Sequence, residues 1–352
     1  MPSFKEHGDR LGLDPQRSFV LGERSLRAYL AGGNVRFLED AEMSFSSVPT
    51  GDRRYDEAQF YLGITKTQLR KTDESIQILE ELRARHSRRG SKVEAAREDK
   101  IGLQLAFAYI KTYTNDGYQK AEQELDIVKR HATEQNDGDL ERQTQAIQAF
   151  LYSVMAGRFT PEERRSEYAN AALQVGKKLL EVSPFSPEIR FEALNALGIT
   201  WMRIAENRWN IEPSVDAWSA SESYYDQALD IVPSSVRVLQ NLAALRMIQV
   251  VEGFPGDEIQ LLNEAEEFCV RSLEVNDQDQ YPFLELAKIR TAKGDPNHAL
   301  DAIHEGRTRP GAVKSEEWER VESVAKRLAA TSRPSRESPQ GILRELQKKN
   351  ES

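Results

Sequence analysis

The chain has 352 residues, of which 39% are hydrophobic and 30% are charged, and its formal net charge is −9 at pH 7. This length allows two ordinary domains or one long array, and the charged fraction is typical of stacked helices that each keep one face in water. An acidic chain lacks the basic face that phosphate binding requires, so we expect no nucleic-acid partner.

The charge is unevenly distributed along the chain. From Arg307 onward there are 11 Lys and Arg against 7 Asp and Glu, so residues 1–306 carry a net charge of −13. The single cysteine, Cys269, allows no disulfide within one chain and fits a reducing compartment. The first residues lack the apolar stretch of a signal peptide, and no run of about 18 apolar residues could span a membrane. We therefore expect a cytoplasmic protein with no membrane partner.

The N-terminal part predicts an arm followed by two short helices. Residues 1–17 are polar, with two glycines and two prolines, and predict a flexible arm. Ser18–Leu30 and Val35–Phe45 are predicted helices, separated by Gly32-Gly33-Asn34. Residues 18–54 thus form a degenerate helix pair ahead of the main array.

Two hairpins far apart in the chain share one internal spacing. Gly63 in Tyr55–Leu82 and Ala287 in Tyr281–Gly306 are each followed by three residues at offsets of 12, 16 and 19. Those residues are Ser75, Leu79 and Leu82 in the first hairpin, and Ala299, Ile303 and Gly306 in the second. Ala287 and Ala299 are small, which lets the two helices of their hairpin approach closely. Gly294-Asp295-Pro296 forms the turn of the second hairpin, because glycine ends a helix, aspartate caps the next and proline suits its first position.

This spacing resembles the tetratricopeptide repeat (TPR), a helix hairpin of about 34 residues that stacks into a solenoid. Leu197-Gly198 and Trp201 match the first helix of that family. The second helix and its end are matched by Ser221, Tyr225, Ala228-Leu229 and Pro233. The resemblance implies an all-α, right-handed α-α superhelical solenoid over residues 55–308 that binds other proteins.

The segment between the two clear hairpins carries a weaker pattern. Arg83–Lys100 is a basic insertion, which is either a solvated helix end favoured by the helix dipole or a dock for an acidic partner surface. Ile101–Tyr113 and Leu140–Gly157 are predicted helices. Thr160-Pro161-Glu162-Glu163 begins the partner of the latter, which stops at Pro184.

Two consecutive hairpins, 191–233 and 236–276, are longer than the repeat. The small residue of the second helix lies 23 residues after Gly198 and 22 after Ala243, instead of 12. The excess equals about three helical turns, which we divide between two antiparallel helices. We predict that the hairpins project a ridge tipped by four apolar residues: Trp209, Ile211, Phe254 and Pro255.

The resemblance also implies a concave groove lined by the first helices, where ligand peptides lie. From the register of these helices and from the ridge, we expect these partner-binding residues: Asn195, Met202, Arg203, Trp209, Ile211, Arg237, Gln240, Met247, Phe254, Tyr281 and Lys288. Family members that hold a C-terminal carboxylate place lysine and asparagine at successive groove positions, and Asn195 alone matches that pattern.

The C-terminal part predicts a capping helix and a tail. Residues 309–331 carry a helix with a polar back, which suits the end of a solenoid. Residues 332–352 are a linker followed by a basic amphipathic piece, Gly341–Lys349. That piece either lies in the acidic groove as an autoinhibitor or is a disordered end.

No catalytic constellation stands out in the sequence. His298 and His304 are six residues apart and do not share a helical face, and there is no phosphate-binding glycine loop, nucleophile elbow or zinc-type cysteine pair. We expect no catalytic residue, no metal site and no cofactor. The leading interpretation is a non-enzymatic scaffold, adaptor or regulatory subunit, with an effector enzyme as one kind of partner. The alternative is an α/α-array enzyme, or a small-molecule or peptide sensor, with a site in the groove.

Overall fold

The computed structural model describes residues 14–30, 34–87, 92–157, 160–181, 186–212, 214–309, 313–330 and 337–347, with the side chains of 92–95 left out. All structural statements below concern these residues. The predicted arm before residue 14 lies outside them, as do the last residues of the predicted basic tail, from 348 onward.

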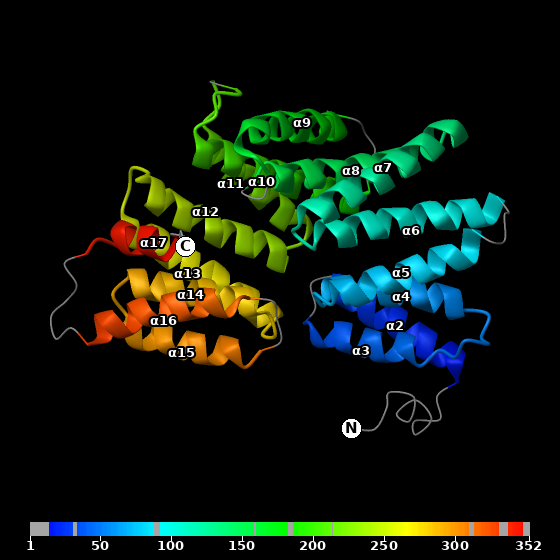
Figure 1. Cartoon of the computed structure of the whole chain (residues 1–352), viewed down its shortest axis with the longest axis horizontal. Coiled ribbons are helices and arrows are strands. Elements are labelled where there is room, and N and C mark those ends of the chain that lie inside the picture. The colour runs from blue at the N-terminus through cyan, green and yellow to red at the C-terminus, as the bar shows by residue number, and fades with distance from the viewer. Residues whose placement is uncertain are drawn as a thin grey trace. The chain divides into compact units, whose positions relative to one another are not determined.

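The described residues form helices only, as the sequence predicts, and they divide into two compact units between Val232 and Pro233 (Figure 1). Each unit is described by itself. The helices of unit 1 are α2 (Pro15–Leu30), α3 (Arg36–Ser46), α4 (Tyr55–Gln68), α5 (Thr72–Ser87), α6 (Lys92–Ile110), α7 (Asn115–Gln135), α8 (Gly138–Met155), α9 (Glu162–Glu181), α10 (Pro187–Asn207) and α11 (Ala217–Ile231).

Unit 2 contains two complete hairpins and two further helices. Its helices are α12 (Val236–Glu252), α13 (Glu258–Val275), α14 (Gln280–Ala292), α15 (Pro296–Arg307), α16 (Ser315–Ala329) and α17 (Pro339–Gln347). In both units each even-numbered helix up to α14 packs on the helix that follows it, and this pair packs on the next pair. The all-α repeat architecture expected from the sequence is therefore confirmed within each unit.

The spacing shared by the hairpins has a structural basis at the point where two paired helices cross. Ser75 donates a hydrogen bond to the carbonyl of Gly63 over 2.7 Å, and Ser221 donates one to the carbonyl of Gly198 over 2.9 Å. A Cβ added at Gly198 would lie 2.5 Å from the ring of Tyr225. Glycine at this position leaves the space that the ring of Tyr225 occupies, so the two helices can lie close together.

The turn of the α14–α15 hairpin is formed as predicted. Gly294 has a φ of +78°, the left-handed conformation that glycine adopts without a steric penalty. The Asp295 carboxylate accepts a hydrogen bond from the backbone N–H of His298, and Pro296 is the first residue of α15.

Two predicted boundaries differ from the structure. The helix expected from Ile101 begins at Lys92, so the basic insertion consists largely of the ends of α5 and α6. The helix α2 begins at Pro15 instead of Ser18, so residues 15–17 of the predicted arm are helical. Within the former insertion, Arg83 pairs with Glu124 of α7 at 2.5 Å.

The two long hairpins use their extra residues differently. In the α10–α11 hairpin the first helix has 21 residues and the second has 15, so α10 takes most of the added length. The α12–α13 hairpin has helices of 17 and 18 residues, against 13 and 12 in α14–α15. The expected division between both helices is therefore correct for α12–α13 and less even for α10–α11.

Candidate interaction sites

Three of the expected partner-binding residues are buried. Asn195 and Met202 of α10 are 1% and 3% exposed, and Met247 of α12 is 3% exposed. A helix in the middle of a stack is covered by its own partner and by neighbouring pairs, which leaves little of its surface for a ligand. Register alone places these residues on one face of a helix, but it does not say how much of that face is covered.

The tip of the α10–α11 hairpin packs on other residues of its own unit. Trp209 and Ile211 are half-buried and pack on an apolar cluster that includes Leu173 of α9 and Trp201 of α10. Next to them, the Glu212 carboxylate accepts hydrogen bonds from the ammonium of Lys177 over 2.6 and 2.7 Å. Arg203 forms an ion pair with Glu206 at 2.6 Å. The apolar tip residues thus give part of their surface to the fold.

The remaining expected residues belong to unit 2 and are more accessible. Tyr281, at the start of α14, is 37% exposed, and Lys288 is paired with Glu285 at 2.8 Å. Gln240 donates a hydrogen bond to Asp279 over 2.7 Å. Arg237 and Phe254 are half-buried.

The C-terminal helix α17 packs on the first helices of both unit 2 hairpins, chiefly on α12 and α14 (Figure 1). Ile342, Leu343 and Leu346 are 1%, 0% and 3% exposed. They share one apolar cluster with Met247 and Leu284. Residues 339–347 therefore form a helix that packs on the hairpins. Of the two alternatives for the tail, the disordered end is wrong for these residues.

Polar contacts fix both ends of α17. Arg344 donates from Nε and Nη2 to the carbonyl of Val251 over 3.2 and 2.8 Å, and Gln340 donates to the same carbonyl over 3.1 Å. Val251 lies in the last turn of α12. Carbonyls in the last turn of a helix receive no hydrogen bond from their own helix, and they attract cations. At the other end, Arg320 of α16 donates to the carbonyl of Leu346 over 3.3 Å.

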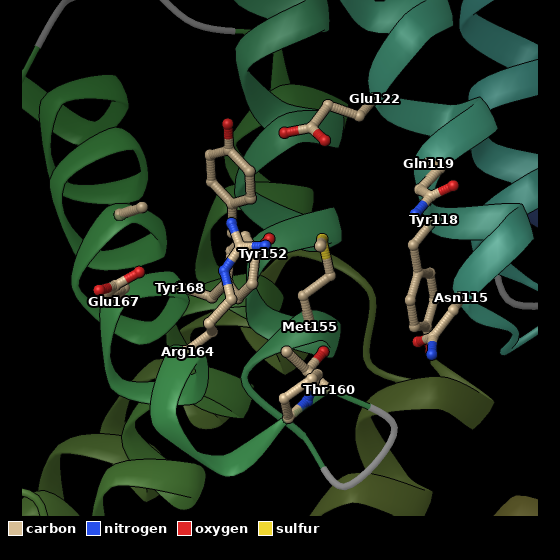
Figure 2. A pocket seen from close by; sticks show the side chains of 12 residues that line it. Asn115, Tyr118, Gln119, Glu122, Tyr152, Met155, Thr160, Arg164, Glu167 and Tyr168 are labelled. Atoms are coloured by element: carbon tan, nitrogen blue, oxygen red, sulfur yellow. The ribbon is translucent and has the colours of Figure 1, made fainter.

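A cavity of about 460 Å³ lies in unit 1 between α7, α8 and α9. Figure 2 shows residues of α7 along one side and residues of α9 along the other, with Tyr152 and Met155 of α8 between them. The rings of Tyr152 and Tyr168 are 5.9 Å apart, and the guanidinium of Arg164 lies 5.3 Å from the centre of the Tyr168 ring. Arg164, Tyr168 and Tyr152 thus form a chain of ring and cation contacts along one wall.

The lining of this cavity combines aromatic and apolar side chains with charged ones, among them Glu122, Arg164 and Glu167. Tyr152 accepts a hydrogen bond from Gln148 over 2.9 Å. Burial raises the pKa of the Tyr152 phenol, and the carboxylate of Glu122 acts in the same direction, so the hydroxyl stays protonated at neutral pH. Such a wall suits an apolar or aromatic side chain of a bound peptide. No sequence pattern predicts this site, because its residues come from three helices and form no motif.

Among the described residues, no three His, Cys, Asp or Glu side chains come together in a way that could hold a metal ion. None of the helices formed there combines the length and the apolar character needed to cross a bilayer.

Comparisons with known proteins find structural neighbours only. No family model matches the chain, and no curated protein matches it. The solved structures that match include a tetratricopeptide repeat protein from Parabacteroides merdae, which is 13% identical with a TM-score of 0.47 and covers 88% of this chain and 99% of its own. The TPR2AB domain of yeast Sti1 in complex with pHSP90 is 13% identical with a TM-score of 0.30, covering 89% and 98%. Human IFIT1 with m7Gppp-AAAA is 10% identical with a TM-score of 0.39, covering 88% and 71%.

The first two of these neighbours carry tetratricopeptide repeats, the kind of helix hairpin that this sequence resembles. The helix pairs and their crossing points show the same architecture directly. One expectation is corrected. We excluded nucleic acid from the acidic net charge, but a neighbour of this fold, human IFIT1, was solved with m7Gppp-AAAA. Net charge is an average over the whole surface and does not describe one face, so it could not support that exclusion.

Proposed function

We propose that the chain is a non-enzymatic, cytoplasmic adaptor or regulatory subunit that binds a protein or peptide partner through its helix hairpins. The observation that carries the proposal is α17, an amphipathic helix seated on α12 and α14. A surface that holds one such helix has the shape and apolar area for recognising helices. The stacked hairpins support the proposal, because each pair leaves a long outer face in water. The lone buried cysteine fits a reducing compartment.

Within this proposal, the accessible members of the expected set make the first contacts. Tyr281 and Lys288 lie on α14, and Trp209 and Ile211 present the exposed part of the α10–α11 tip. Because Asn195, Met202 and Met247 are buried, we assign them to holding the helices in place beneath the contact surface.

The test is capture of a partner by the tagged full chain from an extract of its native cell. We expect one protein in stoichiometric amount with the wild type, and at least fivefold less with the double variant Tyr281→Ser and Lys288→Glu. Glu316→Gln, an exposed change on α16, is the matched control and should capture as much as the wild type. Equal capture by all three chains would place the binding surface elsewhere.

The second candidate function is a small-molecule or peptide sensor. The cavity between α7 and α9 favours it, because its aromatic wall and volume suit a small ligand. A thermal-shift screen of metabolites and short peptides tests this function. A rise in melting temperature that Tyr168→Ala abolishes would support the sensor function. A screen without such a rise would leave the adaptor function as the single candidate.

A further inference from the structure

The helix α17 follows α16 in the chain but does not extend the stack of hairpins. It packs chiefly on α12 and α14, with smaller contacts on α13 and α16. A helix that merely closed the end of the array would cover the last hairpin, as α16 covers α15. Instead α17 lies across the first helices of two successive pairs, on the side where the sequence analysis expected a ligand.

The apolar part of this seat is specific in its spacing. Two adjacent aliphatic residues, Ile342 and Leu343, and a third one turn later, Leu346, enter the cluster that contains Met247 and Leu284. Positions separated by three or four residues lie on the same side of a helix. The opposite side of α17, with Gly341 and Glu345, is exposed. The surface of α12 and α14 therefore contacts a narrow apolar stripe of α17 and leaves the other side of that helix in water.

The polar groups of the seat define which way a bound helix points. The carbonyl of Val251 takes donors from Gln340 and Arg344, and the Glu258 carboxylate accepts from the N–H of Gln340 over 3.4 Å. A carboxylate near the start of a helix and an arginine near its end both favour the helix dipole. The arginine near the end of α17 is Arg320, which donates a hydrogen bond to the carbonyl of Leu346. A helix in the reverse direction would meet both charges unfavourably.

We propose that the face formed by α12 and α14 is a docking site for an amphipathic helix of a partner protein, and that α17 occupies this site in cis. The partner helix carries the features of α17: paired aliphatic residues with a third one turn later, and Gln or Arg donors that reach the carbonyl of Val251. This inference rests on the proposed function and names the partner chemistry and the regulation of that surface. A tethered helix acts at a high effective concentration, so the partner binds only as α17 leaves.

The test measures competition in the full chain. The probe is a fluorescein-labelled peptide with the sequence of residues 337–347, and binding is read by fluorescence anisotropy. The protein variants are the wild type, Leu343→Asp and Glu345→Gln. The aspartate puts a charge where a side chain is fully buried and releases α17, whereas Glu345 is exposed and contributes one ion pair to Arg327.

We expect Leu343→Asp to bind the peptide at least tenfold more tightly than the wild type, and Glu345→Gln to bind it as the wild type does. A peptide that carries the same Leu343→Asp change should not bind any of the three proteins. Equal affinity of the natural peptide for all three proteins would overturn the proposal, as would equal binding of the altered peptide.

A second measurement on the wild-type chain keeps the test decisive if Leu343→Asp does not fold. Amide hydrogen exchange of the isotope-labelled protein is followed by NMR with and without an excess of unlabelled peptide. We expect α17 amides to exchange at least fivefold faster with peptide while α15 amides keep their rate. An unchanged rate in α17 contradicts displacement.

The peptide experiment contains no cellular protein, so its outcome is independent of partner capture. If the peptide competes but no partner is captured, the face accepts helices and the adaptor function fails. If a partner is captured but the peptide does not compete, the adaptor function stands and the partner binds at another surface.

Discussion

The α12–α14 face of unit 2 and the cavity between α7 and α9 in unit 1 are formed by the same kind of hairpin, yet one is covered and the other is open. On the first, α17 brings three aliphatic side chains that are at most 3% exposed. In the second, the rings of Tyr152 and Tyr168 and the guanidinium of Arg164 line about 460 Å³ of unfilled space. The repeat thus provides surfaces of both kinds, and the chain outside the repeat decides which of them stays free.

The largest expected effect tests whether the covered face is part of the core of unit 2. Leu343→Ala removes a fully buried side chain, so we expect a loss of about 2–5 kcal/mol in the free energy of unfolding. Tyr168→Ala, at a half-buried position in the open cavity, should cost clearly less. Urea unfolding of both variants checks this order, and equal losses would remove the distinction between the two sites.

The polar end of the covered face should give an intermediate effect. Arg344→Met keeps an unbranched apolar stem but loses both hydrogen bonds to the carbonyl of Val251, which Gln340 alone then satisfies. We expect a cost of about 1–2 kcal/mol in unfolding free energy. Glu345→Gln is the matched control one residue away. It removes an exposed ion pair and should cost under about 0.5 kcal/mol.

A pH series tests how α14 is held against α13. Burial alone would raise the pKa of Glu266, but hydrogen bonds from Lys293 and Arg290 outweigh it and hold that pKa below its ordinary value of 4.5. Because the folded pKa is the lower one, this stabilisation is complete above pH 4.5 and is lost as the pH falls through the folded pKa. Glu266→Gln should be less stable than the wild type at pH 7, and the two should converge in acid. A difference that persists unchanged at low pH would exclude this origin.

The smallest effect is expected at the open cavity. Arg164→Ala removes an exposed guanidinium from the face of Tyr168, a contact worth about 0.5–1 kcal/mol. Thermal unfolding should therefore change little, whereas any ligand found for the cavity should bind more weakly. A large loss of stability would mean that the cavity wall belongs to the core of unit 1.

Local patterns predicted much of the fold because they report helix crossings and turns. The spacing from Gly63 to Ser75 recurs from Ala287 to Ala299 because small residues are needed where the paired helices cross, and the turn at Gly294 follows from backbone conformation. The start of α6 at Lys92 was missed, because charged residues along a solvated helix carry no apolar period.

The sites were less predictable, since they depend on contacts between segments distant in sequence. Met247 was placed on the ligand side of its helix, and it lies in the cluster that α17 enters. The sequence left open whether the tail would cover that cluster, because a nine-residue helix is stable only when it packs on something. The cavity between α7 and α9 was not predicted at all, because a void has no sequence pattern.

The position of Cys269 has a practical consequence for all these measurements. It is the only cysteine of the chain and is 1% exposed, and burial raises the pKa of its thiol well above the usual value. The thiolate is the form that attacks maleimide reagents, so the native protein should remain unlabelled near neutral pH. A cysteine introduced at an exposed residue of α17, such as Glu345, would then carry a fluorophore or spin label at one defined site. Its separation from the hairpins could be followed in the otherwise natural chain.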